Sequence, residues 1–249
     1  MFVQTIRDAI TAVYDYERNM AAVSNAQVHR FNTDTFERVI YTESHDAVAC
    51  GQGNGRLPEA IWRGKATSWY SQKRSTLGAG IVFTAPGIPM IFQGQEFLEW
   101  GCWNDKNQLD WSKTTAFSGI VNLYRDLIHL RRNWFNNTRG LRSQHIHVHH
   151  VNESDKVIAF HRWNLGGPGD DVIVVLNMAN RAYDSYAIGF PREGLWKVRF
   201  NSDWNGYSTD FGNHLSYDTS AQPDAKDNMP CMGNVGIGPY TIIILSQDA

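Results

Sequence analysis

The chain changes its sequence pattern once, near residue 142, and this change restricts the folds that it can adopt. Before that point, segments long enough for helices alternate with short apolar runs. After it, the apolar segments have the length of strands and are separated by Gly, Asn, Asp and Pro. The pattern predicts an α/β region at residues 1–142 followed by an all-β domain at residues 143–249.

Two strands and two long helices are predicted in the first region. Residues 38–44 and 88–96 each begin as an apolar run and end in polar residues, which is typical of buried strands in a parallel sheet. Residues 68–85 and 117–134 have the length and the apolar spacing of helices. Two strands cannot close a barrel. We therefore expect residues 1–35 to be irregular or loosely packed helix.

The second region is predicted to be an antiparallel β-sandwich. Its apolar segments alternate with turn-forming stretches at a spacing typical of such folds. The sandwich has enough apolar surface for a core of its own, so we expect residues 143–249 to fold without the rest of the chain. The predicted strands are residues 145–151, 156–163, 171–179, 186–190, 195–203 and 240–246.

The first predicted strand ends in an adjacent histidine and aspartate, His45 and Asp46. Both residue types are common in solvated turns, so the pair by itself is compatible with a purely structural role. In parallel sheets covered on both faces, however, the functional side chains stand where the strands end. The position of the pair makes it the first candidate for a functional site.

Composition excludes several classes of partner. The formal net charge of −2 gives no reason to expect nucleic acid or an anionic membrane. No apolar window approaches the length of about 18 residues that a membrane span needs. The three cysteines, Cys50, Cys102 and Cys231, are odd in number and widely spaced, which fits neither a disulfide framework nor a zinc site. A reducing, cytoplasmic location is the prediction.

No cofactor or metal is expected. The glycine-rich stretch at residues 51–55 lacks the Lys-Ser/Thr pair of a phosphate-binding loop. His145, His147 and His149 lie on one face of a predicted strand, with His150 opposite. Three imidazoles can bind a transition metal, but no carboxylate or thiol stands at a fixed spacing from them. A solvated or cross-strand-paired face is the preferred interpretation.

Several motifs together resemble the C-terminal part of the α-amylase superfamily of glycoside hydrolases, nearest to the α-glucan branching enzymes. The similarity covers most of the chain from about residue 36. The motifs are YTESHD at 41–46, APGIPMIFQGQEF at 85–97, DWSKTTAFSGIVNLYRDLIHLRRN at 110–133, VVLNMAN at 174–180 and NSDWNGY at 201–207.

The resemblance implies a fold and a site. Residues 1–142 would be the C-terminal portion of a (β/α)8 barrel, with strands seven and eight and their helices. Asp46 would be the carboxylate that binds ring hydroxyls where the bond breaks, more tightly as the sugar approaches its oxocarbenium-like transition state. His45 would hydrogen-bond the same sugar. An anionic acceptor and a neutral donor on a rigid strand end can hold a polyol in one orientation.

The loop after the second predicted strand supplies further candidates. Gln95, Glu96 and Trp103 would contact sugar, because indole rings stack on pyranose faces and polar side chains bind hydroxyls. The alternative is a structured loop with an aromatic plug. Two departures from the branching enzymes also stand out: Ala47 replaces an acidic residue, and Cys50-Gly51 replaces a more polar loop.

The nucleophile and the acid/base of a retaining mechanism are not recognised in this chain. A complete barrel takes about 250 residues, so the chain is expected to be a C-terminal fragment or subunit, inactive alone. Its expected partners are the missing N-terminal barrel segment and an α-glucan, whether glycogen, amylose or a maltooligosaccharide. A non-catalytic carbohydrate-binding or regulatory half and an α-amylase-type hydrolase remain as alternatives.

Overall fold

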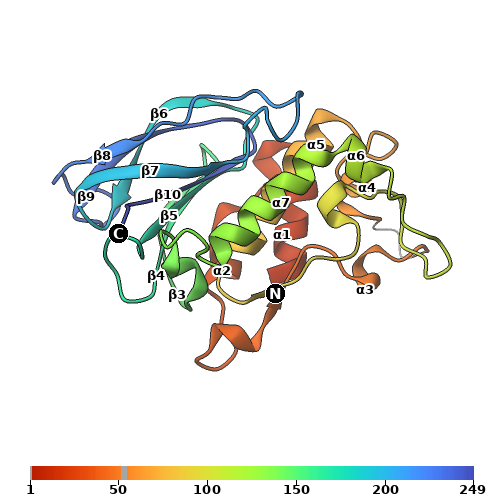
Figure 1. Ribbon diagram of the computed structural model, residues 1–249, viewed down its shortest axis with the longest axis horizontal. Helices are drawn as coiled ribbons and strands as arrows, with labels where there is room; N and C mark the ends of the chain where they lie inside the picture. The colour runs from red at the N-terminus through yellow and green to blue at the C-terminus, as the bar shows by residue number, and fades with distance from the viewer. Residues whose placement is uncertain (1, 52–54) are drawn as a thin grey trace.

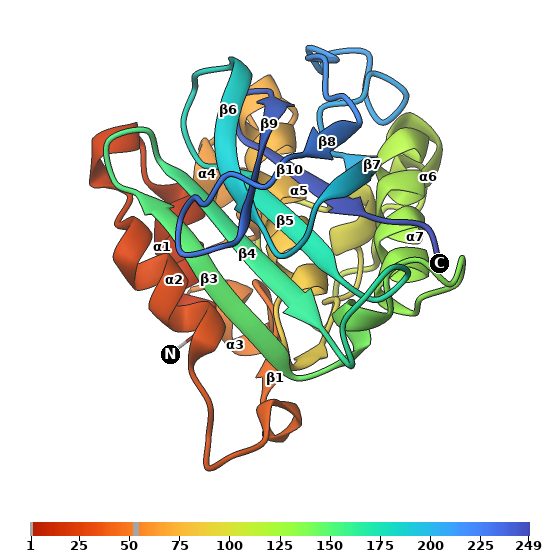
Figure 2. The same ribbon diagram turned by 90° about the vertical axis from the view of Figure 1, so that its left-hand side faces the viewer.

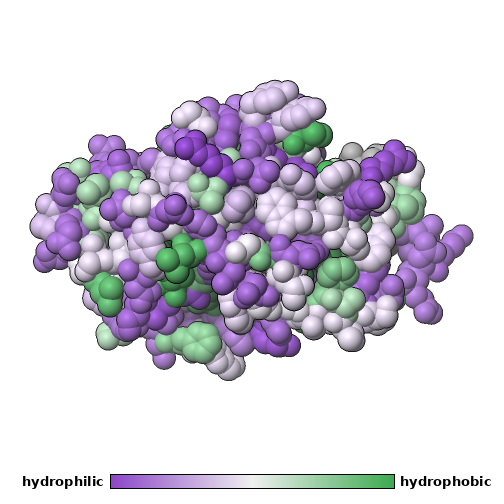
Figure 3. All heavy atoms as spheres, turned by 90° about the horizontal axis from the view of Figure 1, so that it is seen from above, coloured by the Kyte–Doolittle hydropathy of each residue, from purple (hydrophilic) through white to green (hydrophobic). Residues whose placement is uncertain are grey.

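The computed structural model describes residues 2–51 and 55–249 and has three layers. Helices cover one face of a six-stranded antiparallel sheet, and a two-stranded sheet covers its other face (Figure 1, Figure 2). The surface seen in Figure 3 is mostly hydrophilic, with hydrophobic residues in separate patches. Among the described residues, no helix is long and apolar enough to cross a bilayer.

The long helices agree with the sequence predictions. The predicted helices at 68–85 and 117–134 are α5 (Trp69–Thr84) and α7 (Ser118–Arg131). Helix α5 begins where Ser68 accepts a hydrogen bond from the backbone N–H of Ser71. The other helices are α1 (Phe2–Thr11), α2 (Met20–Val28), α3 (His45–Val48), α4 (Leu57–Ile61) and α6 (Lys113–Ala116), with 3-10 turns η1 (Asp15–Glu17), η2 (Thr35–Glu37), η3 (Gln95–Phe97) and η4 (Arg139–Arg142).

Helix α5 lies at the centre of the molecule because two glycines let its neighbours approach closely. A Cβ at Gly80 would stand 2.5 Å from Ile242 of the sheet, and a Cβ at Gly78 would stand 2.7 Å from Ile10 of α1. These contacts explain why a helix without a clear polar face is stable here: it is buried on nearly every side.

The N-terminal helices are better packed than the sequence indicated. Ile6, Ile10, Met20 and Val23 are fully or almost fully buried and belong to the main core cluster. The prediction that residues 1–35 are irregular or loosely packed is therefore wrong for α1 and α2. Their apolar faces pack on α5 and on the first strands of the large sheet.

The two predicted strands of the first region pair in parallel, but over two residues each. Strand β1 (Val39–Ile40) pairs with β2 (Ile88–Pro89), with Val39 opposite Ile88 and Ile40 opposite Pro89. Both segments leave the extended conformation early. The described residues contain no closed eight-stranded ring, as expected for this chain.

The second region forms antiparallel sheets, as predicted. The strand order of the large sheet is β3-β4-β5-β10-β7-β8, and β6 pairs with β9. Strands β8 and β9 were missed, because β8 is short and β9 contains two glycines and no continuous apolar run. The bounds are β3 (His145–Asn152), β4 (Val157–Trp163), β5 (Val172–Asn177), β6 (Tyr183–Phe190), β7 (Gly194–Asn201), β8 (Thr219–Ala221), β9 (Cys231–Ile237) and β10 (Thr241–Ser246).

The large sheet is buried on both faces, and this bears on the prediction that residues 143–249 fold alone. On β5, Val174 faces the core shared with the helices, whereas Ile173 and Val175 face the smaller sheet. The same alternation occurs on β10, with Ile242 and Ile244 toward the helices. Residues of the all-β region alone form the core between the two sheets. Without the helices, the other apolar face of the large sheet would lie in water. Independent folding of residues 143–249 stays a prediction.

Candidate functional site

His45 and Asp46 lie at the surface beyond the carboxyl end of β1, after the intervening residues 41–44. They are the first two residues of α3, a single turn that begins where the Ser44 hydroxyl accepts a hydrogen bond from the N–H of Ala47. His45 Nε2 lies 3.2 Å from Asp46 Oδ1, and the two side chains are 64% and 86% exposed. The pair is therefore adjacent and accessible to a ligand, although it stands on a helical turn and not on a strand.

Buried polar contacts hold the chain in place just before this pair. The side chain of Glu43 is fully buried and accepts a hydrogen bond from the backbone N–H of Leu57 at 2.5 Å. Arg56 lies 3.4 Å from the same carboxylate. Burial raises the pKa of Glu43, and Arg56 opposes that shift. Glu43 was not among the predicted site residues, although it directly precedes the Ser-His-Asp motif in the sequence.

Trp103 joins His45 at the surface. Its ring centroid lies 5.9 Å from that of His45 and 6.1 Å from that of Phe92. Its backbone forms a parallel bridge with Ala49, in which the Trp103 N–H donates to the carbonyl of Val48 at 2.8 Å. The structure thus brings together three of the predicted site residues, namely His45, Asp46 and Trp103.

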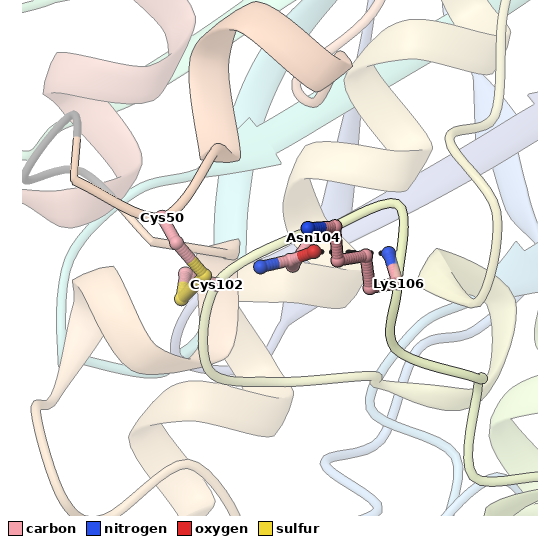
Figure 4. Close-up of a disulfide and its surroundings, with 4 residues drawn as sticks. All are labelled: Cys50, Cys102, Asn104 and Lys106. Atoms are coloured by element: carbon pink, nitrogen blue, oxygen red, sulfur yellow. Dashed lines mark hydrogen bonds between the residues drawn. A yellow bond between two sulfur atoms is a disulfide. The ribbon is translucent and has the colours of Figure 1, made fainter.

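A disulfide between Cys50 and Cys102 connects the two loops of the site (Figure 4). The expectation that the cysteines do not form a disulfide framework is therefore wrong for this pair, and the argument for a reducing, cytoplasmic location loses its support. Of the three cysteines, two form the disulfide and the third, Cys231, is a buried free thiol. The usable signal was that Cys50 and Cys102 each follow one of the two neighbouring strands. The disulfide also accounts for the departure at Cys50.

Gln95 lies beneath the site and not at its surface. It is 7% exposed, and its Nε2 donates to the Thr42 hydroxyl at 2.6 Å. Its Oε1 accepts from the backbone N–H of Phe92 at 3.2 Å. Gln95 therefore ties the segment after β2 to the segment after β1.

Glu96 points inward as well. Its Oε2 atom is buried and has no hydrogen-bond partner among the described residues. Its charge contributes to the raised pKa of the buried Tyr124 hydroxyl, after burial and Glu43. The neighbouring Glu99 forms a largely buried ion pair with Lys113, whose ammonium lies 3.6 Å from the ring centroid of Trp100. The carboxylates of Glu96 and Glu99 therefore stabilise the loop after β2 and do not face a ligand at the surface.

The histidines of β3 have separate contacts. A bulge between Val148 and His150 interrupts the alternation assumed from the sequence. The His145 ring stacks on Trp163 at 5.4 Å, and His150 Nδ1 lies 3.1 Å from Asp227. No group of three potential ligands suited to a metal occurs within residues 2–51 and 55–249. The cross-strand pairing of His147 with His161 agrees with the interpretation of a paired face.

The burial of His149 makes the free energy of unfolding depend on pH. Its two ring nitrogens are buried without partners among the described residues, and burial is the main cause that lowers its pKa to about 4. The nearby charges of His147 and His161 lower it further, and Asp227 opposes them. The unfolded histidine binds its proton near pH 6.5. The contribution of neutral His149 to the free energy of unfolding is therefore fully present above pH 6.5 and is lost as the pH falls toward 4.

We expect the free energy of unfolding to fall by about 2 kcal/mol more between pH 7 and pH 5 in the wild type than in His149→Leu. Urea titrations at the two pH values measure this difference. The exposed His29, which is not among the groups that act on His149, provides the control, since His29→Gln should retain the wild-type fall. Equal pH dependence in wild type and His149→Leu would show that His149 is not the responsible group.

A family model and curated relatives match this chain. The model of the α-amylase C-terminal all-beta domain matches residues 147–248. The 1,4-alpha-glucan branching enzyme GlgB 1 of Xanthomonas campestris pv. campestris strain 8004 is 28% identical over 229 residues, which are 84% of this chain and 29% of that protein. GlgB of Pseudomonas syringae pv. syringae strain B728a is 29% identical over 205 residues, 75% of this chain and 25% of that protein.

Solved structures with similar folds include two pullulanases. The pullulanase from Anoxybacillus sp. LM18-11 complexed with maltotetraose superposes with a TM-score of 0.65 at 22% identity, covering 98% of this chain and 34% of its own. Pullulanase type I from Bacillus subtilis str. 168 complexed with maltose gives a TM-score of 0.64 at 19% identity, over 99% and 35% of the two chains.

Both kinds of comparison concern only part of the longer proteins. The chain spans 29% and 25% of the two branching enzymes, which is less than a third of their length. Within the chain, the matched all-beta region coincides with the strands β3 to β10. The chain is therefore homologous to 1,4-alpha-glucan branching enzymes over part of their length, and its residues 147–248 match the α-amylase C-terminal all-beta domain.

Proposed function

We propose that this chain is the C-terminal part of an α-glucan-active retaining enzyme of the branching type. Residues 1–142 would supply strands seven and eight of a (β/α)8 barrel with their helices, and residues 143–249 the domain that follows. The parallel pairing of β1 with β2 supports this assignment, because the strands of such a barrel are parallel. The nucleophile and the acid/base would come from barrel strands outside this chain.

The observation that carries the proposal is the exposed His45–Asp46 pair next to Trp103, in the segment that follows the carboxyl end of a strand of the parallel pair. The Asp46 carboxylate would accept hydrogen bonds from two ring hydroxyls, and the His45 imidazole would donate one. As positive charge develops on the sugar, the fixed carboxylate stabilises the transition state more than the ground state. Trp103 would offer its ring to a neighbouring glucose unit.

The buried residues near the pair would act on sugar only indirectly. Gln95 holds Thr42 and so fixes the segment that leads to His45. Glu96 is directed into the protein, and we assign it a supporting role in the same loop. The partners of the chain would then be an α-glucan and the polypeptide that completes the barrel.

The test is to incubate the purified chain with amylose, alone and joined to a polypeptide that carries the missing strands. Reducing ends and iodine-stained chain length report hydrolysis and branching separately. We expect activity only in the completed protein. Asp46→Asn should then lower kcat/KM by about 100-fold or more, because it removes about 3 kcal/mol of transition-state binding.

Asp105→Asn is the matched control, since Asp105 is an exposed aspartate in the loop that contains Trp103 and has no assigned role. It should leave kcat/KM unchanged. Activity of the chain by itself, or a completed protein that tolerates Asp46→Asn, would contradict the assignment. Glucan binding without any turnover in the completed protein would favour the alternative of a non-catalytic carbohydrate-binding half, and new reducing ends without branching would favour a hydrolase.

A further inference from the structure

A second concave site lies between the helical region and the sheets. It is a groove with a volume of about 1100 Å³, and its lining includes neither His45 nor Asp46. The segment after α1, the end of α4, the β3–β4 turn and the β5–β6 turn form its walls. In the ribbon view, the ends of these elements meet where the helices adjoin the sheets (Figure 2).

Exposed aromatic rings stand along this groove. Tyr14, Tyr16 and Trp62 are 56%, 76% and 46% exposed and all line it. The rings of Tyr14 and Tyr16 are stacked, with centroids 5.4 Å apart and planes within 7° of parallel. The ring of Trp62 packs edge-on against Tyr70 at 5.5 Å. Aromatic faces held open to water in a groove are suited to a ligand with flat C–H surfaces.

Two carboxylates of the groove, those of Asp15 and Glu153, already have partners. Asp15 accepts hydrogen bonds from the Tyr240 hydroxyl at 2.6 Å and from the Asn180 backbone N–H at 2.8 Å, and it pairs with Arg18. In the β3–β4 turn, Lys156 lies 2.6 Å from Glu153. Because these carboxylates are paired, a cationic ligand gains little from the groove, whereas a ligand rich in hydroxyls finds both ring faces and polar groups.

We propose that this groove binds a short segment of α-glucan, separately from the His45–Asp46 site. The choice of the α linkage rests on the proposed function, whereas the preference for a saccharide rests on the exposed aromatic faces of the groove. Such a site would hold one part of a long polymer while another part occupies the site at His45 and Asp46. Two linked sites on one polymer raise the local concentration of each segment at the other.

The experiment measures the Kd of maltoheptaose by calorimetry, with cellohexaose as the β-linked comparison. The groove variant is Tyr16→Ala/Trp62→Ala, and the site variant is His45→Ala/Asp46→Asn. The control is Trp134→Ala, because Trp134 is an exposed aromatic outside the groove. We expect the groove variant to bind at least about 10-fold more weakly than wild type, whereas Trp134→Ala and the site variant retain the groove binding.

The remaining outcomes each contradict one part of the proposal. Undiminished binding in the groove variant, or no binding of maltoheptaose to the wild type, overturns the groove proposal and leaves the proposed function to the activity assay of the completed protein. Equal binding of cellohexaose overturns the α-glucan assignment. If circular dichroism shows that the double variant is misfolded, the single variant Tyr16→Ala, at a largely exposed side chain, must weaken binding at least about 3-fold for the proposal to stand.

Discussion

Replacing Lys73 by Met is expected to lower the free energy of unfolding by about 3–5 kcal/mol, because it leaves a buried carboxylate without its counter-ion. Lys73 on α5 and Asp203 after β7 are both fully buried, with Nζ 2.7 Å from Oδ1. The ammonium also donates to the Thr241 hydroxyl at 3.0 Å. Burial lowers the pKa of Lys73 to about 8, and Asp203 opposes this shift.

Asp203 has further contacts that explain the size of the effect. Its carboxylate accepts the backbone N–H groups of Gly212 at 3.2 Å and of His214 at 2.8 Å, and so organises the loop after β7. Lys73 therefore links the central helix to this loop and to β10. An unpaired Asp203 would have to stay charged in the interior, take up a proton or leave the core, and each of these outcomes costs stability.

A double-mutant cycle provides the control. In Lys73→Met/Asp203→Asn neither charge remains, so we expect a smaller loss than the sum of the two single changes. Urea unfolding of the wild type and the three variants measures the coupling. A loss below about 1 kcal/mol for Lys73→Met, or additive single effects, would show that the pair is not coupled in this way.

Removal of the disulfide is the second large effect. Cys50 and Cys102 are separated by 52 residues in the sequence. A cross-link that closes a loop of this length lowers the conformational entropy of the unfolded chain, which stabilises the folded state by about 4 kcal/mol. We expect Cys50→Ser/Cys102→Ser to lose about this much stability. Because the bond lies next to Trp103, the same change should also loosen the pairing of Trp103 with Ala49 and weaken glucan binding at His45 and Asp46.

Chemical measurements check the disulfide directly. The unfolded, unreduced protein should show one free thiol, from Cys231, out of three cysteines. Dithiothreitol should lower the melting temperature of the wild type and leave that of the double variant unchanged. The matched control is Cys231→Ala, which should remain sensitive to the reductant. Three reactive thiols in the unfolded wild type would contradict the bond.

The candidate site was partly readable from the sequence. The run YTESHD identified His45 and Asp46, and the structure exposes both beside Trp103. The same reasoning placed Gln95 among the sugar contacts, whereas its amide is buried against Thr42. A motif indicates which residues lie near a strand end. It does not indicate which of them face water, because that depends on segments packed from elsewhere in the chain.

The sequence by itself determined the elements whose cause is local. Helices α5 and α7 and most strands of the all-β region follow from apolar spacing and turn residues within short windows. The tertiary structure decided the remainder: the Cys50–Cys102 bond, the burial of Lys73 against Asp203, the core shared by the helices and the large sheet, and the aromatic groove between them. Each of these joins residues far apart in the chain, so its energy depends on packing that no short window of sequence contains.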